Sequence, residues 1–342
     1  MTMNDYVLSK AKLKYWLEDI RRRNELWAPV GGGDSVSYLK NPKGEDVATE
    51  FTNSLDCPKY IFSPQQDPIC NFEIKGRGEV VVEEIKPDTT PRVVFGLRPP
   101  DVRGLEIMDA YLLKDKVDER YKAKRDNTTV VSLGYHNPAP CCFAEAVGVD
   151  LFPKKGSDIL LTDLGRSYYV ETLSEKGENL VSEHFNEADD IVRNEAWDIQ
   201  KRSKGTTDFD LHLDKWKDFT DSEIYTLPYW DEIYLGVIAD SVATRYFYSG
   251  TYFKIVDVSK GTRGTRYKTW TTMYSPNFSV LPNGYDYKPS LKEKFKDWIL
   301  EMFHFFPKRH GFIGCSGAHR CIAGMTTKHD IRKIIANVDF GT

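Results

Sequence analysis

The sequence carries little net charge of either sign. Its 342 residues include 47 lysines and arginines and 51 aspartates and glutamates, which gives a formal net charge of −4. Such a balance excludes the strongly basic surface by which proteins bind nucleic acid or anionic lipid. We therefore expect no nucleic acid partner and expect another protein in that role.

Long apolar runs are also missing. Residues 1–16 contain no apolar stretch between a basic start and a small-residue cleavage site, so they do not resemble a signal peptide. No uninterrupted run approaches the roughly 20 apolar residues that cross a bilayer. These absences predict a cytoplasmic protein without membrane insertion, in which the six cysteines are free thiols or metal ligands.

Several common catalytic motifs are absent as well. The chain contains no G-x-S-x-G, H-E-x-x-H or G-x-G-x-x-G segment and no zinc-type pair of cysteines. Three glycines at 31–33 are not followed by the Lys-Ser/Thr pair and helix of a phosphate-binding loop. We interpret them as a surface loop.

The residues that are present predict two domains. Hydrophobic residues make up 40% of the chain, which is enough for a substantial core and, at this length, for more than one domain. We assign residues 1–222 to a mixed α/β domain and residues 223–342 to a mainly helical domain. The boundary follows a charged segment, 186–223, that is poor in β-branched residues.

Local periodicity predicts the elements of the first domain. A helix is expected over 13–20, and strands over 93–97 and 128–133 flank a helix around 105–112. This order predicts a crossover unit with parallel strand pairing. Asp101 precedes the helix and is expected to cap its N-terminus.

Further local patterns predict other strands and helices. The β-branched run at 80–82 favours a strand, and residues 159–162 and 168–171 favour a hairpin across a turn-forming segment. In the second domain, the capping pair Ser290 and Glu293 opens an apolar helix that Pro307 should end, and a short helix follows at 330–336.

One segment near the C-terminus has a spacing related to iron–sulfur ligation. Four-iron clusters of the bacterial ferredoxin type are held by C-x2-C-x2-C-x3-C-P. Cys315 and Cys321 occupy the first and third positions, whereas Ala318 and Met325 occupy the second and fourth, and Thr326 replaces the proline. Two thiolates do not satisfy four iron corners, so we interpret Cys315 and Cys321 as remnant ligands.

The remaining cysteines allow several interpretations. Cys141 and Cys142 are adjacent, so their side chains point in different directions. Cys142 is a candidate single metal ligand, a candidate nucleophile if His136 lies beside it, or a buried structural thiol. Cys57 and Cys70 match no zinc or redox spacing, and we assign them no chemistry.

An ordered series of segments resembles one family: the beta subunits of cytosolic hydrogenases and sulfhydrogenases, with the corresponding electron-transfer subunit of anaerobic sulfite reductase. The similar segments are 27–30, 59–64, 95–101, Cys142-Phe143 with Gly148, 160–165, 169–171 and 174–178. The resemblance implies a C-terminal ferredoxin-like domain with two four-iron clusters that relay electrons between a partner's redox centre and a flavin or ferredoxin.

The chain departs from this family at every expected cluster loop. Pro100 and Ala144 stand where the family often has cysteine. Residues other than cysteine also occupy the positions in 237–253 where ligands are expected: Val237, Asp240, Ala243, Phe247, Gly250 and Tyr252. The resemblance therefore implies a degenerate ferredoxin-like domain. The aromatic residues at 246–248, 252 and 253 suit either a protein interface or the repacking of an emptied cluster site.

These observations lead to three hypotheses about function. We expect a non-catalytic, cluster-free structural subunit of an anaerobic iron–sulfur redox complex, with other subunits of that complex as partners and no cofactor. The first alternative is an electron-transfer subunit that carries a four-iron four-sulfur cluster for a hydrogenase or reductase. The second alternative is a thiol-dependent enzyme.

Overall fold

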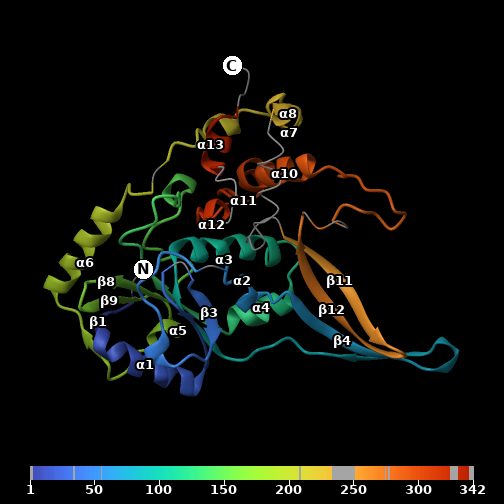
Figure 1. Ribbon diagram of the computed structural model, residues 1–342. Helices are drawn as coiled ribbons and strands as arrows, with labels where there is room; N and C mark the ends of the chain where they lie inside the picture. Colours follow the sequence, from blue (N-terminus) through green and yellow to red (C-terminus); the bar gives the residue numbers. More distant parts are fainter. Residues whose placement is uncertain are drawn as a thin grey trace.

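The body of the protein is built on one eight-stranded sheet (Figure 1). The computed structural model describes residues 3–33, 35–54, 56–207, 209–232, 251–273, 275, 278–323 and 330–338. The strands lie in the order β10-β1-β9-β8-β7-β6-β2-β3. Their bounds are β1 Asp5–Ser9, β2 Glu25–Val30, β3 Ser37–Lys40, β6 Arg92–Leu97, β7 Thr128–Leu133, β8 Ile159–Asp163, β9 Ser167–Thr172 and β10 Phe185–Glu187.

The centre of this sheet is parallel and is buried on both faces. Strands β2, β6, β7 and β8 pair in parallel, and α3 (Pro99–Leu112) and α4 (Glu119–Asp126) connect β6 to β7. This confirms the predicted crossover unit. The β8–β9 hairpin is antiparallel, as predicted.

Helices cover the two faces of the central strands. Val93 and Phe95 of β6 face the core that contains α1 (Lys10–Arg23), whereas Val94 and Leu97 face the core that contains α3. The strand has an irregularity between Phe95 and Leu97, at Gly96, which has a φ of 77°. The apolar residues of the predicted helix, Leu13, Trp16, Leu17 and Ile20, lie in α1 and are all buried, as expected for an amphipathic helix.

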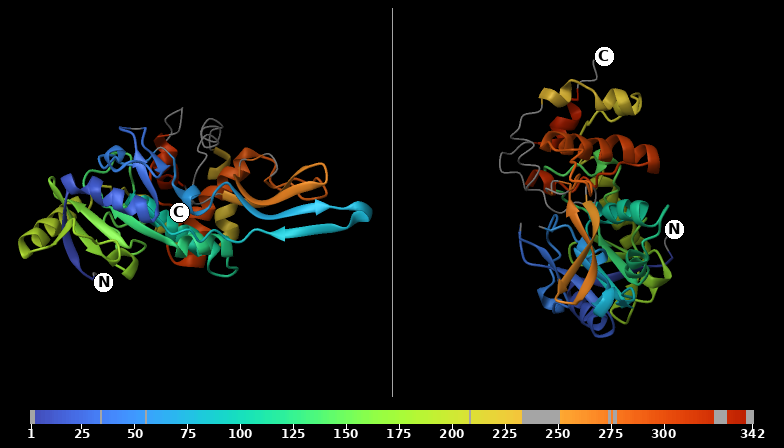
Figure 2. Two further views of the ribbon diagram at one scale, coloured as in Figure 1. Left: turned by 90° about the horizontal axis from the view of Figure 1, so that it is seen from below. Right: turned by 90° about the vertical axis from the view of Figure 1, so that its right-hand side faces the viewer.

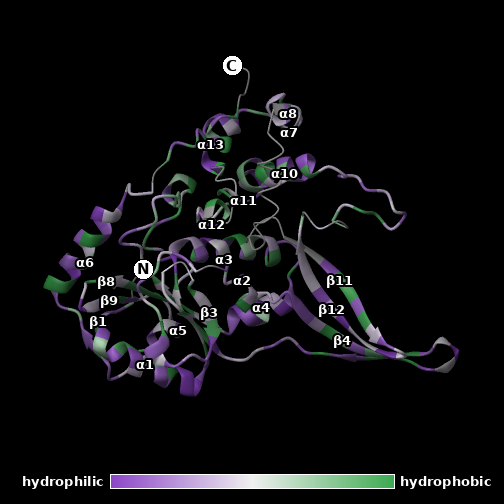
Figure 3. Cartoon of the chain, in the orientation of Figure 1, coloured by the Kyte–Doolittle hydropathy of each residue, from purple (hydrophilic) through white to green (hydrophobic). Residues whose placement is uncertain are grey.

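A second sheet projects from the body as an arm. It contains β11 (Thr251–Lys260), β12 (Arg263–Thr272), β4 (Gln66–Ile74) and β5 (Val80–Glu84), in that order. Figure 2 shows the arm extending away from the body, and Figure 3 shows hydrophobic residues along its strands. The predicted strand at 80–82 is therefore present, in the arm.

The arm changes the architecture expected of the C-terminal part. Strands β11 and β12 are ten residues each and pair over their whole length. A mainly helical, ferredoxin-like C-terminal domain is thus not confirmed, and the mixed α/β class is. Because β12 pairs with β4, one sheet includes residues from both sides of the predicted boundary at 222, which stays a prediction.

Helices of the C-terminal part pack above α3 (Figure 1). Helix α10 (Leu291–Leu300) begins at the predicted cap Ser290 and continues as the π-helix η5 (Glu301–Phe305) and then as α11 (Phe306–His310). The prediction that Pro307 ends the helix is wrong. Proline has no N–H to donate, and the wider π turn just before it accommodates that loss.

The remaining helices are short or peripheral. They are η1 (Gly44–Asp46), α2 (Lys59–Phe62), η2 (Gly76–Gly78), η3 (Glu145–Val147), α5 (Glu175–Glu178), α6 (Asp190–Ser203), η4 (Lys215–Lys217), α7 (Asp221–Tyr225), α8 (Tyr229–Glu232), α12 (Arg320–Ala323) and α13 (Ile331–Ala336). The short helix predicted over 330–336 is thus present, with Asp330 as its cap. None of the helices in the described ranges has the length and apolar content needed to cross a bilayer.

Candidate functional site

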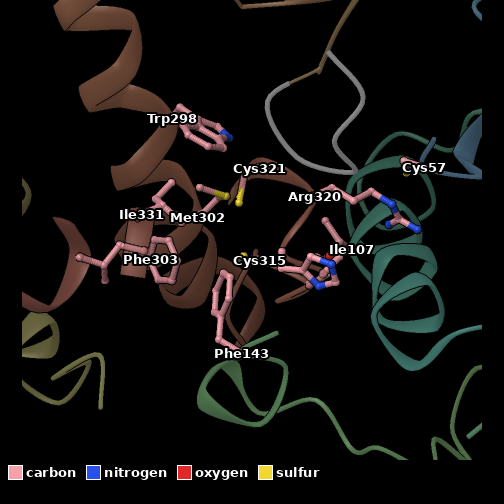
Figure 4. A pocket seen from close by; sticks show the side chains of 14 residues that line it. Cys57, Ile107, Phe143, Trp298, Met302, Phe303, Cys315, Arg320, Cys321 and Ile331 are labelled. Carbon is pink, nitrogen blue, oxygen red and sulfur yellow. The ribbon is translucent and has the colours of Figure 1, made fainter. Parts of the chain in front are cut away.

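The candidate site is a small pocket around the two cysteines of the iron–sulfur-like segment. Figure 4 shows Trp298, Met302 and Cys321 on one side of it and Arg320 and Cys57 on the other. The cavity has a volume of about 40 Å³. At about 10–15 Å³ for each water, that is room for roughly three water molecules.

Close approach of two loops forms the floor of this pocket. The Gly317 carbonyl oxygen accepts from the Phe143 N–H at 3.3 Å and from the Cys142 Sγ at 3.5 Å, and the Gly317 N–H donates to Cys315 Sγ at 3.4 Å. Gly317 has a φ of 67°, and a Cβ there would lie 2.6 Å from the Ala144 Cα. The structure thus brings together the loop of Cys142 and the loop of Cys315, two segments that are far apart in the sequence.

The thiols around the pocket are held in their protonated form. Burial raises the pKa of Cys57, Cys142 and Cys315 to about 11. The pKa of Cys321 is raised further, first by burial and then by the proximity of Cys315. A nucleophilic cysteine needs a lowered pKa, so this environment disfavours the thiol-enzyme hypothesis.

His136 does not change that conclusion. Burial lowers the pKa of its imidazole, and the backbone of Asp163 and the ring of Phe152 are among its neighbours. The groups that shift the pKa of Cys142 are its own burial, nearby backbone, Cys141, Glu145 and Arg332. Within the described residues, nothing therefore activates Cys142 through His136.

The cysteines present do not fit a four-iron cluster, which needs four converging thiolates. All six cysteines of the chain lie in the described part and are free thiols. Across the described ranges, the one group of three metal-type side chains within ligand distance is Asp19, Glu183 and His184, far from these thiols in sequence. A space for about three waters is also too small for the eight heavy atoms of a cubane. The assignments of Cys315 and Cys321 as remnant ligands and of Cys142 as a candidate single ligand stay predictions.

A buried ion pair closes the side of the pocket next to α3. The Arg320 guanidinium donates to both carboxylate oxygens of Asp101, at 2.7 and 3.0 Å, and to the Ser54 carbonyl and hydroxyl, at 3.0 and 2.9 Å. Asp101 is fully buried. The cap residue of α3 is Arg98, so the prediction that Asp101 caps the helix is wrong. No local pattern links two residues 219 positions apart, which is why sequence reasoning missed this pair.

A second set of polar contacts holds the loop that supplies Ser54. Asn53 donates to the Ala318 carbonyl at 2.9 Å, and the Tyr135 hydroxyl donates to Asn53. The buried Arg98 guanidinium donates to the carbonyls of Gly134, at 3.2 Å, and Thr49, at 3.1 Å. The loop at 49–54 is therefore anchored both to the body and to the C-terminal segment.

The first comparison with known proteins concerns the C-terminal part of the chain. A family model described as a 4Fe-4S dicluster domain matches residues 248–328. Only Cys315 and Cys321 of the six cysteines fall in that stretch. The positions 237–250, and Met325 and Thr326, lie outside the described residues.

The whole chain is then similar to a particular hydrogenase subunit. It is 23% identical over 320 residues to "Sulfhydrogenase 2 subunit beta" of Pyrococcus furiosus, across 91% of this chain and 92% of that protein. No solved structure matches. These findings confirm the predicted resemblance to hydrogenase beta subunits of the dicluster type. They also count against the expectation that no iron–sulfur cofactor is involved.

Proposed function

We propose that this chain is an electron-transfer-type subunit of a multi-subunit oxidoreductase complex, in the place of a hydrogenase beta subunit. The observation that carries the proposal is similarity over nearly the full length of both proteins, together with the dicluster match. These similarities support electron transfer more than the purely structural role that we expected from the missing cysteines. The proposed partners are the other subunits of that complex.

The donor set of this chain limits the proposal. Two clusters of the four-iron type need about eight cysteine ligands, whereas the sequence has six, of which two lie in the matched stretch. We therefore derive no electron-transfer step through a cluster held by this chain.

A cluster-free architectural subunit is the second candidate, and the packing of the pocket favours it. The space next to Cys315 and Cys321 is lined by Trp298, Met302 and Phe303, and the Arg320–Asp101 pair closes one side. A shell of large apolar side chains beside two isolated thiols is what an architectural subunit requires.

Metal content of the native complex separates the two candidates. The tagged chain is purified without oxygen from the cells that make it, and iron and acid-labile sulfide are measured on this chain after separation from its partners under non-denaturing conditions. A cluster-bearing subunit yields about four to eight iron atoms per chain, with a reduced-cluster signal in electron paramagnetic resonance, and the signal disappears in the Cys315→Ala/Cys321→Ala variant. An architectural subunit is colourless and iron-free. If no oxidoreductase subunit co-purifies, both candidates are wrong.

A further inference from the structure

The outer strand of the arm, β5, is unusually apolar for an edge strand in contact with water. Val80, Val81 and Val82 are 52%, 42% and 61% exposed, although they are consecutive and so point to both faces of the sheet. Ile74 on β4 pairs with Val80 and is 44% exposed. The apolar surface therefore extends from the edge strand onto its neighbour.

The backbone of β5 also presents hydrogen-bonding groups outward. β5 is the last strand of its sheet and pairs only with β4 in the described part of the chain. The Lys75 N–H donates to the Glu79 carbonyl, and the Ile85 N–H donates to the Ile69 carbonyl. In an antiparallel pair of strands, residue pairs that are joined by hydrogen bonds alternate with pairs that are not. Since Glu79 and Ile85 are bonded to the neighbouring segment of the chain, the odd-numbered residues of β5 bond to β4. The N–H and C=O groups of Val80, Val82 and Glu84 consequently point away from the sheet.

Natural edge strands carry protection that β5 lacks. Lysine, proline, bulges and interspersed charges normally prevent an exposed edge from pairing with other chains. The opposite edge strand of the same arm, β11, has charged residues at Lys254, Asp257 and Lys260. The sequence of β5 is Val-Val-Val-Glu-Glu, with no charge over its first three residues and a regular register with β4.

The charges that directly flank the three valines are of one sign. Glu79 precedes the valines, and Glu83 and Glu84 follow them. None of the three forms an ion pair with a described residue, whereas Glu73 on the adjacent strand is paired with Arg263 at 3.0 Å. A strand that approached this edge would meet apolar side chains in the middle and unpaired carboxylates at the ends.

We propose that β5 is a docking edge on which another subunit of the complex adds a strand, through main-chain hydrogen bonds to Val80, Val82 and Glu84. The incoming strand is apolar on both faces, to match the three valines, and carries lysine or arginine beside the glutamates. A second copy of this chain suits the edge less well, because it brings three more glutamates to the same place. This inference rests on the proposed function, since it takes the partner from the same complex.

Val82→Pro is the sharpest test of this edge. Proline removes the outward N–H of residue 82, fits an edge strand, and leaves the hydrogen bonds between β5 and β4 in place. Val82→Thr is the matched control, because it has nearly the same shape and keeps the N–H. The oxidoreductase subunits that co-purify with the wild-type chain are separated from it. Their affinity is then measured by titration with the wild-type chain and with each variant, and the melting temperature of each variant is first shown to equal that of the wild type.

The expected result is at least about a tenfold weaker association for Val82→Pro and less than about a threefold change for Val82→Thr. Hydrogen exchange gives an independent readout: the amides of Val80, Val82 and Glu84 exchange rapidly in the isolated chain and slowly in the wild-type complex. Equal affinity of the proline variant, with no protection of these amides, would overturn the inference while leaving the proposed function intact. If the wild-type chain forms a dimer that Val82→Pro abolishes, the strand that docks on β5 comes from a second copy of this chain and the inference of another subunit is wrong. If the wild-type chain brings down no oxidoreductase subunit, the proposed function itself fails.

Discussion

Both the pocket and the arm contain apolar side chains, which are buried around the pocket and exposed to solvent on the arm. Around the pocket, loops from three distant parts of the chain are joined by buried polar contacts, and the cysteines are buried or half-buried. In the arm, consecutive valines stand in water and the outer backbone groups of the edge strand have no partner strand within the described ranges. The first region is complete within one chain, whereas the second becomes complete only when another chain covers it.

The comparison predicts that the largest stability effects lie at the pocket. Asp101→Ala leaves the Arg320 guanidinium largely buried without its carboxylate, and we expect the free energy of unfolding to fall by about 3–5 kcal/mol. Chemical denaturation of the purified chain measures it. Asp257→Ala is the control in the arm, because the ion pair of Asp257 with Arg266 is exposed to solvent and its loss should change stability little. Equal effects at the two sites would remove the contrast between the regions.

A smaller effect is expected where the two pocket loops touch. Gly317→Ala places a Cβ against the Ala144 backbone at a positive φ, and we expect a loss of about 2–4 kcal/mol. Gly311→Ala is the matched control, because that glycine has a φ of 80° with no atom near the added Cβ. It should cost only about 1 kcal/mol. If the two variants lose the same stability, the loops do not press together as described.

The root of the arm predicts a pH dependence. Burial lowers the pKa of Lys59 to about 7, and its Nζ lies 3.8 Å from the ring centroid of Trp270 on β12. The unfolded lysine has a pKa of about 10.4, so between pH 7 and pH 10 the unfolded chain binds more protons and stability rises with pH. Below pH 7 both states are protonated and the penalty is constant.

Lys59→Met removes this contribution. The stability of the variant relative to wild type should therefore decrease by about 3 kcal/mol between pH 7 and pH 10. Denaturation midpoints measured across that range in both proteins test it. Parallel profiles would mean that the lysine stays charged in the folded chain.

The smallest expected signal is the reactivity of the pocket thiols. With pKa values of about 11, Cys142 and Cys315 have roughly one part in a thousand as thiolate at pH 8. Iodoacetamide should modify them slowly in the folded chain and quickly in denaturant, as followed by mass spectrometry. Rapid modification of a single native cysteine would restore the thiol-enzyme hypothesis.

Elements with strong local patterns were predictable from sequence. The helix around Trp16, the crossover from β6 through α3 to β7, and the β8–β9 hairpin each carry their own periodicity or turn residues. The cap at Ser290 is a local signal too. The prediction that the helix ends at Pro307 was wrong because a π turn, which depends on the surrounding packing, allows the helix to continue.

The arm and the polar anchor of the pocket were not predictable in this way. Strands β4 and β12 are separated by about 190 residues, as Arg263 and Glu73 show, and no local pattern specifies their pairing. The ion pair of Arg320 with Asp101 likewise joins two distant residues that no local pattern links. In each case the contact joins residues that are far apart in the sequence, and the path of the intervening chain through the fold decides that they meet.

The residue types alone determined that this chain offers too few thiols for two four-iron clusters, because ligand number is counted without any geometry. Tertiary structure decided which cysteines lie together, which carboxylate faces Arg320, and that the valines of β5 remain in water. Those outcomes depend on long-range packing and burial, which set the distances and the local dielectric around each group.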